Sequence, residues 1–331
     1  MTLATIAFFV GAIVSLATSW VLVTRLERIG ERLGLSEALL GVVAALAADA
    51  PEITSSISAI AQHQRAIGAG VVIGSNAFNL AALLGLGAVV SGFITLHRRV
   101  VVLGGLIAMW IALCCVFTSV GAVTPLLGLI LTSAVFIPNL IVLGVRRDAL
   151  RRVAASTAFA TWLSSAIDEE EEELEVAIRP VIGTSTDVVM ALVALVVVVV
   201  ASVAMERGAS TIGHHLHVAD AVVGGVVLAA VTSLPNAVAA VHLAAKRRGA
   251  AAFSTALTSN NLNVIAGFLL PGAIVGVARS TFAGNLTALS YLALTILVLV
   301  VAFAQRGLSR RVGWAVIAGY LVFVAWLVAV T

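Results

Sequence analysis

Two carboxylates lie within a long apolar stretch, between Gly41 and Gly87, that is long enough for two membrane spans. Asp49 and Glu52 are three positions apart in it, with Pro51 between them. A carboxylate in hydrocarbon costs roughly 2.5–3.5 kcal/mol, so two close together require a compensating cation or proton. Pro51 has no N–H, so the carbonyl of Ala47 loses its helical donor and becomes free to bind another group. We therefore expect oxygen ligands for a hard cation inside a membrane.

The same stretch carries neutral oxygen ligands further along the chain. Ser75 and Asn79 are spaced i, i+4, which places both side chains on one helix face. Carboxylate, amide and hydroxyl oxygens suit Ca²⁺, Na⁺ or Mg²⁺, and Ca²⁺ best tolerates six to eight ligands in irregular geometry. No intramembrane Cys or His lies near these motifs, which disfavours Zn²⁺ and Cu⁺. Nothing in the pattern predicts covalent catalysis, so we expect neither an enzyme nor a cofactor.

The composition is typical of a membrane protein. Hydrophobic residues make up 61% of the chain and charged residues 11%, against about 45–50% and 25% in a soluble domain. The net charge of +3 is spread over short basic clusters between apolar runs, which does not indicate nucleic-acid binding. Apolar runs long enough to span predict an all-α protein of ten helices. These lie near 3–23, 37–61, 67–94, 100–119, 124–145, 183–205, 219–245, 250–274, 285–305 and 312–330.

Basic residues orient these spans. With both termini outside, sixteen of the 19 Lys and Arg residues fall in inside loops, and only Arg65, Arg207 and Arg279 fall outside. This bias favours that orientation, in a prokaryotic plasma membrane. The only long polar segment, 146–182, is then a cytoplasmic linker with an acidic run from Asp168 to Glu175. We interpret this run as solvated; a cation-sensing role is the alternative.

An internal duplication divides the chain into two halves. The first repeat, 41–87, and the second repeat, 225–272, are related by a shift of 184 residues, which superimposes Pro51 on Pro235, Ser75 on Ser259 and Asn79 on Asn263. The expected organisation is therefore residues 1–145 as a first five-helix half, the linker, and residues 183–331 as a second. Five spans per half invert the second half relative to the first, as in many secondary transporters.

At these residues the chain resembles the cation/calcium exchanger superfamily, which includes sodium/calcium and proton/calcium exchangers. Its inverted alpha repeats each carry a GTSxPE-like helix followed by a GSNxxN/D-like helix. Here the first repeat reads ADAPE and GSNAFN, and the second reads TSLPN and TSNNLN. The resemblance implies cation ligands in both repeats, and spans one and six as the moving elements. With Asp49 added, the expected set is Asp49, Glu52, Ser75, Asn79, Ser233, Asn236, Ser259 and Asn263.

The chain departs from the family pattern at two positions. Asn236 replaces the usual glutamate of the second proline motif, and Asp49 replaces the usual Ser or Thr of the first. The carboxylate count stays at two, but both carboxylates belong to the first repeat. Pro51 and Pro235 are expected to break their helices and release carbonyls.

We therefore expect an integral membrane antiporter that exchanges a divalent cation, Ca²⁺ in the first place, for Na⁺ or H⁺ around a midplane site. Its predicted partners are inorganic cations and the lipid bilayer, and the oligomeric state is left open. Two alternatives remain at this point. One is a cation channel, and the other is a cation-binding membrane sensor or scaffold that does not transport.

Overall fold

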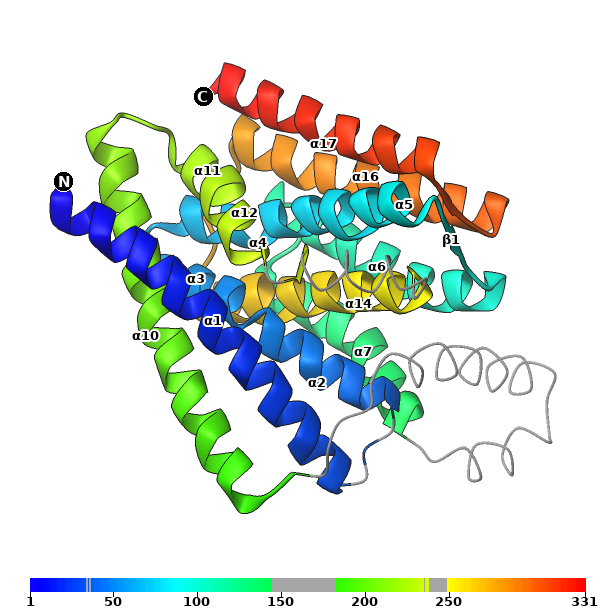
Figure 1. Cartoon of the computed structure of the whole chain (residues 1–331). Helices are drawn as coiled ribbons and strands as arrows, with labels where there is room; N and C mark the ends of the chain where they lie inside the picture. Colours follow the sequence, from blue (N-terminus) through cyan, green and yellow to red (C-terminus); the bar gives the residue numbers. More distant parts are fainter. Residues whose placement is uncertain (34, 36, 145–182, 235, 238–248) are drawn as a thin grey trace.

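The computed structural model shows a bundle of helices of very different lengths (Figure 1). It describes residues 1–33, 35, 37–144, 183–234, 236–237 and 249–331. Pro235, the linker 146–182 and its acidic run lie outside the described residues, so the predictions made for them stay predictions. The chain ends lie on the same side of the bundle, to the left in Figure 1.

Six of the described helical segments are long and apolar enough to cross a membrane. They are α1 (Thr2–Leu33), the segment Arg65–Ser91, α6 (Arg98–Ser119), α10 (Ser185–His215), α16 (Phe282–Gln305) and α17 (Arg310–Val330). The other expected spans are shorter, interrupted or only partly described, among them α7 (Pro125–Gly144). The count of ten therefore remains a prediction.

The helix break expected at Pro51 is present. α2 (Glu37–Ala48) ends before Asp49, and α3 (Ala50–Ala61) begins after it with a proline in its first turn. In the second repeat, α11 (Asp220–Val222), the π-helix η2 (Val223–Leu228) and α12 (Ala229–Thr232) end at the turn residue Ser233. Both repeats thus break at equivalent positions, because 49 and 233 differ by the repeat offset of 184.

The second helix of each repeat changes from α to π geometry after its polar motif. α4 (Arg65–Asn79) continues as η1 (Leu80–Leu86) and α5 (Gly87–Ser91). α14 (Gly249–Leu262) continues as η3 (Asn263–Leu269) and α15 (Leu270–Val275). Wider π turns are frequent next to functional sites. Here η1 directly follows GSNAFN, and η3 begins at the last residue of TSNNLN.

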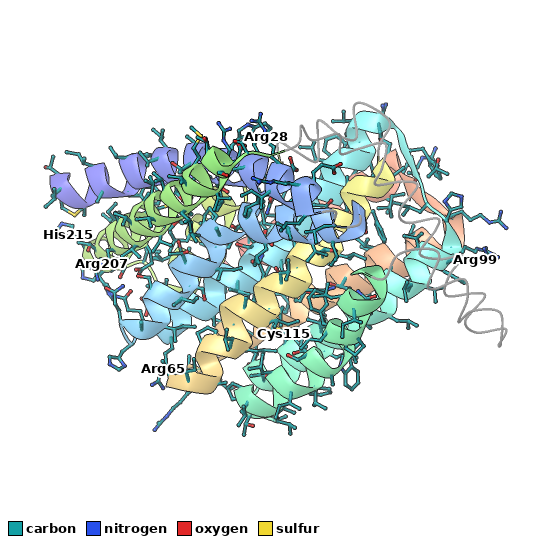
Figure 2. All side chains as sticks on the ribbon, turned by 90° about the horizontal axis from the view of Figure 1, so that it is seen from below. Arg28, Arg65, Arg99, Cys115, Arg207 and His215 are labelled. Atoms are coloured by element: carbon teal, nitrogen blue, oxygen red, sulfur yellow. The ribbon has the colours of Figure 1, made fainter. Side chains whose placement is uncertain are left out.

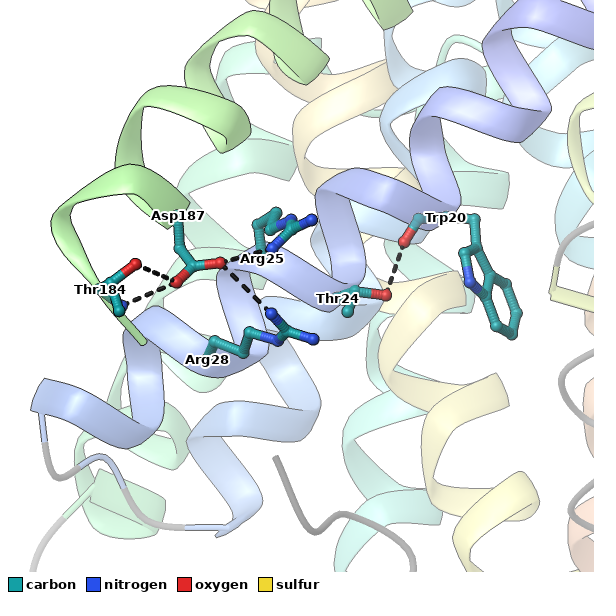
Figure 3. A network of polar contacts seen from close by, with 6 residues as sticks. All are labelled: Trp20, Thr24, Arg25, Arg28, Thr184 and Asp187. Atoms are coloured by element: carbon teal, nitrogen blue, oxygen red, sulfur yellow. Dashed lines mark hydrogen bonds and ion pairs between the residues drawn. The ribbon is translucent and has the colours of Figure 1, made fainter. Parts of the chain in front are cut away.

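α1 and α10 are antiparallel and lie side by side across one face of the bundle (Figure 1). Both helices extend well past the predicted apolar runs, to Leu33 and His215. At one end Asp187 accepts hydrogen bonds from the Thr184 backbone and hydroxyl at 2.7 and 2.8 Å, and it pairs with Arg25 at 2.7 Å (Figure 3). Arg28 lies 3.6 Å from the same carboxylate. The ion pair between Arg25 and Asp187 thus joins α1, in the first half of the chain, to α10, in the second half.

A short antiparallel ribbon closes the end of the bundle opposite the chain termini. β1 (Phe93–Thr95) pairs with β2 (Gly307–Ser309), with Ile94 opposite Leu308. Figure 2 shows Arg65, Arg207 and His215 at one end of the molecule and Arg99 at the other. The larger apolar core lies between these ends and includes Val72, Leu84 and Phe253, which are fully buried.

Candidate cation site

The interrupted helices bring the predicted polar side chains of the two repeats together in the interior. Asp49 and Glu52 are fully buried, although they lie in an apolar bundle. Ser233 is fully buried and Asn236 is 6% exposed. The remaining predicted ligands, Ser75, Asn79, Ser259 and Asn263, are at most 1% exposed.

Each carboxylate pairs with a neutral side chain of the other repeat. Ser233 Oγ donates to Glu52 Oε1 at 3.0 Å, and Asn236 Nδ2 donates to Asp49 Oδ1 at 2.8 Å. Ser259 Oγ donates to the same Asp49 oxygen at 2.6 Å. Sequence separations of 181 to 210 residues make these contacts invisible to local pattern analysis.

The two pairs are copies of one contact. The repeat offset of 184 residues carries Asp49 onto Ser233 and Glu52 onto Asn236. The pair Asp49–Asn236 therefore has the pair Ser233–Glu52 as its equivalent. Each pair contains one carboxylate and one neutral partner, but the carboxylate is at the first position in one pair and at the second position in the other. Relative to the family pattern, the carboxylate of this pair has moved from position 236 to its contact partner at position 49. The pair therefore keeps its negative charge.

Asparagines of the GSNAFN and TSNNLN segments connect the two repeats at the equivalent positions. Asn76 Nδ2 donates to the Asn260 carbonyl at 3.0 Å, and Asn260 Nδ2 donates to the Asn76 carbonyl at 3.1 Å. This reciprocal contact marks the point where the two repeats meet. The side-chain amides of Asn76 and Asn260 are therefore used in contacts between the repeats.

Asn79 and Asn263 keep their amide oxygens available. Asn79 Nδ2 donates to Ser259 Oγ at 3.3 Å and to Asn260 Oδ1 at 3.1 Å, while Asn263 Nδ2 donates to Asn76 Oδ1 at 3.2 Å. Ser75 has other partners in the second repeat: its hydroxyl donates to the Ala229 carbonyl at 3.3 Å and lies 3.5 Å from Thr232 Oγ1.

Buried acceptor oxygens outnumber the donors available to them in this region. In the described part of the chain, four such atoms have no hydrogen-bond partner: Asp49 Oδ2, Glu52 Oε2, Asn79 Oδ1 and Asn263 Oδ1. A buried acceptor without a donor costs about 1–3 kcal/mol, and more when it is charged. A cation bound among these residues would satisfy the oxygens that it contacts. No group of three or more His, Cys, Asp or Glu side chains occurs among the described residues, so such a site depends on amide and hydroxyl oxygens.

The carbonyl released by Pro51 has a partner in this structure. Ser19 Oγ of α1 donates to the Ala47 carbonyl at 3.1 Å and lies 3.4 Å from the Ala48 carbonyl. We expected this carbonyl to be free to bind another group. It instead accepts a hydrogen bond from α1 and so connects the helix break to that helix. The equivalent prediction for Pro235 falls outside the described residues.

Two functional candidates were missed by the sequence analysis. Ser19 gives no signal, because a serine in an apolar helix is common. Glu206 lies one residue beyond the predicted sixth span and was treated as part of an outside loop, but α10 continues past it and buries it completely. α10 also includes His214 and His215 in its last turn, so the helix ends ten residues beyond the predicted sixth span.

Comparison with known proteins agrees with this architecture. The sodium/calcium exchanger protein family matches residues 3–167 and 186–329, and the chain belongs to this family. Members of this family are named as exchangers, which are transporters and not enzymes. The chain is an integral membrane protein of this class.

Solved structures and one curated relative are also similar to this chain. A structure of the sodium–calcium exchanger NCX_Mj superimposes with a TM-score of 0.59 at 19% identity, covering 98% of both chains. The H⁺/Ca²⁺ exchanger CAX superimposes with a TM-score of 0.70 at 12% identity, covering 99% of this chain and 86% of CAX. A protein of Alkalimonas amylolytica named "Putative antiporter CaxA" is 33% identical over 89 residues, a match that spans 27% of this chain and 28% of CaxA.

Proposed function

We propose that this protein is a secondary active antiporter that exchanges Ca²⁺ for Na⁺ or H⁺ at the site between its two repeats. Asp49 and Glu52 serve as the charged ligands. The neutral oxygen ligands are Ser75, Asn79, Ser233, Asn236, Ser259 and Asn263.

The observation that carries the proposal is that Asp49 and Glu52 each contact a neutral side chain of the other repeat and each keep one carboxylate oxygen without a donor. Asp49 and Glu52 are both fully buried, and each retains one carboxylate oxygen without a donor in the described part of the structure. Two carboxylates neutralise one divalent cation, and the nearby Asn79 and Asn263 amide oxygens add neutral ligands of the kind that Ca²⁺ accepts. In the absence of a cation or proton, two buried carboxylates would be strongly unfavourable.

Exchange follows from competition for the same oxygens. Two carboxylates neutralise one Ca²⁺, two Na⁺ or two H⁺, so the site cannot hold the divalent cation and its full complement of counter-ions together. Each turnover then requires release of one kind of ion before the other is bound. The similarity to both a sodium–calcium exchanger and an H⁺/Ca²⁺ exchanger supports either counter-ion.

The proposed mechanism is alternating access between two inverted halves of five helices each, residues 1–145 and 183–331. Asp49–Asn236 and Ser233–Glu52 lie where the halves meet, so motion of one half against the other changes which side the site faces. α1 and α10 contact the broken helices, through Ser19 to Ala47 and through the Ser202 carbonyl to Ser55. We assign these two helices as the moving elements.

The test is uptake of radioactive Ca²⁺ into proteoliposomes that contain the purified full-length chain. Uptake is compared under an outward Na⁺ gradient, an outward H⁺ gradient and no gradient, with protein-free liposomes as the control. We expect uptake to be driven by one of the two gradients, which then identifies the counter-ion.

Two other outcomes would reject the proposal in favour of a different class. Equal Ca²⁺ flux with and without a counter-ion gradient would indicate a channel. Binding of Ca²⁺ by folded protein without flux under any gradient would indicate a sensor or scaffold.

A further inference from the structure

A third carboxylate, Glu206, is buried in the membrane-spanning part of the fold outside the Asp49–Glu52 site. It lies on α10, nine residues before His215, or about 13 Å along the helix from its end. The side chain is fully buried, whereas the neighbouring Arg207 is exposed. In the described part of the chain Glu206 forms no ion pair with a basic side chain. An ionised Glu206 would therefore have no ion-pair partner among the described residues.

The contacts of Glu206 use only one of its two oxygens. Ser58 Oγ donates to Glu206 Oε2 at 2.8 Å, and Gln62 Nε2 donates to the same atom at 2.9 Å. Gln62 Nε2 also lies 2.8 Å from Ser58 Oγ, so the three side chains form one closed cluster. Glu206 Oε1 is buried and has no partner among the described residues. An acceptor thus remains open in a cluster that also contains the Ser58 hydroxyl oxygen, while Gln62 faces the cluster with its amide nitrogen.

The end of α3 adds to the negative potential at this position. Ser58 and Gln62 belong to its last turn and C-cap, where helix carbonyls carry partial negative charge. Gln62 and Ser58 donate single neutral hydrogen bonds, which do not offset a full charge in an apolar surrounding. A cation at Glu206 Oε1 would offset both the negative charge of the carboxylate and the partial negative charge at the end of α3.

A row of polar side chains connects Glu206 with the Asp49–Glu52 site. Along α3, Glu52, Ser55, Ser58 and Gln62 lie on one face over about 15 Å. Ser55 Oγ approaches the Ser202 carbonyl of α10 at 3.5 Å, one turn before Glu206. Ser202 Oγ in turn bonds Ser15 Oγ of α1 at 2.7 Å. Ser15, Ser55 and Ser202 are fully buried, so the row continues through an otherwise apolar interior.

We propose that Glu206 and Ser58, held in place by the Gln62 amide, form a second cation-binding site, selective for a monovalent cation such as Na⁺. This site lies between the end of the molecule marked by His215 and the Asp49–Glu52 site. One carboxylate with neutral oxygen ligands balances one positive charge, whereas the Asp49–Glu52 pair balances a divalent cation. The position of this site on an ion pathway rests on the proposed function, but its ability to bind a cation does not.

The test is equilibrium binding of radioactive Na⁺ and Ca²⁺ to the purified full-length protein in detergent. The variants are Glu206→Gln, Ser58→Ala and Glu52→Gln, with Thr211→Ala as a matched control. Thr211 is exposed on the same helix, and its hydroxyl bonds only the Arg207 carbonyl of its own turn. Glu206→Gln removes the charge but keeps the shape and a hydrogen-bond acceptor for Ser58 and Gln62, and elution as a single species checks its fold.

We expect Glu206→Gln to weaken one class of Na⁺ binding at least about tenfold and to leave Ca²⁺ binding unchanged. Ser58→Ala should weaken the same class by a smaller factor, and Thr211→Ala should have no effect. Glu52→Gln should remove Ca²⁺ binding and retain this class of Na⁺ binding.

Unchanged Na⁺ binding in both Glu206→Gln and Ser58→Ala would overturn the proposal and show that Glu206 is a protonated structural carboxyl. Loss of Ca²⁺ binding in place of Na⁺ binding would overturn its selectivity for a monovalent cation. Neither result depends on the Glu52→Gln variant. Normal Ca²⁺ binding by Glu52→Gln would contradict the proposed function and would leave the proposal for Glu206 intact.

Discussion

Asp49 and Asn236 show that a negative charge in this site can be supplied by either member of a contacting pair of residues, and not only by one fixed sequence position. Their side chains touch at 2.8 Å, so a carboxylate on either one places negative charge in nearly the same space. In the equivalent pair, Ser233 and Glu52 touch at 3.0 Å with the carboxylate on the other member. A position-by-position comparison with a motif therefore overstates how much this site has changed.

Glu52 carries the most direct prediction at the scale of single residues. Glu52→Gln removes one of two charges but retains an oxygen that accepts the bond from Ser233 Oγ. We expect Ca²⁺ uptake to fall to the level of protein-free liposomes, while the protein stays folded and extractable. Uptake and gel-filtration elution measure the two effects. Normal uptake in this variant would exclude Glu52 from the site.

The charge-pair interpretation predicts rescue across the contact. Asp49→Asn alone should raise the Ca²⁺ concentration for half-maximal uptake at least about tenfold, because a ligand charge is lost. The double variant Asp49→Asn with Asn236→Asp should recover most of this loss, because the charge returns to the same pair. Asp49→Asn with Asn260→Asp is the control, since Asn260 does not contact Asp49 in the structure. Equal rescue by both double variants would contradict the interpretation.

Close packing of helices depends on glycine at a few positions. α4 packs against η2, and a Cβ placed on Gly70 would lie 2.8 Å from the Gly225 backbone nitrogen and 3.2 Å from the Gly224 carbonyl carbon. Backbone atoms cannot move aside as side-chain ends can, so the helices must separate. Since α4 carries Ser75 and Asn79, the contact also sets where these side chains lie.

We predict that Gly70→Ala destabilises the protein by about 1–3 kcal/mol, the usual cost of overpacking a well-packed interface. The measurement is the thermal unfolding midpoint of the purified protein. Gly104→Ala is the control, because a Cβ there would lie at an ordinary 3.6 Å from Leu257 Cδ1. Alanine is also about 1 kcal/mol better than glycine in a helix, so Gly104→Ala should be neutral or stabilising. Equal midpoints for the two variants would refute the packing argument.

At the scale of the whole molecule, charge is distributed between two ends. Arg65, Arg207 and His215 lie at one end, and Arg99 lies at the other together with the β1–β2 ribbon (Figures 1 and 2). From the excess of basic residues in the predicted inside loops, we propose that the Arg99 end faces the cytoplasm. In this proposed orientation the chain termini lie outside.

This orientation predicts a labelling pattern for single introduced cysteines. His215→Cys should react with a membrane-impermeant thiol reagent in intact cells, and Arg99→Cys should react only after permeabilisation. His215 and Arg99 are both exposed, while the native Cys114 and Cys115 are buried, which keeps the background low. The unsubstituted chain is the control. The reverse pattern would invert the assignment of both ends.

Much of the architecture follows from the sequence alone, because hydrocarbon imposes strict conditions on it. Apolar runs have to be helical, since every backbone polar group in a membrane needs an internal partner. Pro51 has to interrupt its helix, and the offset of 184 residues reveals two related halves before any coordinates are known. The oxygen chemistry of Asp49, Glu52 and Asn79 likewise predicts a hard cation.

Only the tertiary structure decided which of these residues meet. The decisive contacts join residues that are 181 to 187 positions apart, so a pattern read along the sequence cannot predict them. They are Asp49 with Asn236, Glu52 with Ser233, and Asn76 with Asn260. The ends of α1 and α10 were also decided by contacts, because Arg25 with Asp187 and Ser58 with Glu206 allow charged residues to continue a buried helix. Hydropathy ends a span at its first charge, whereas a folded protein can bury that charge beside a partner.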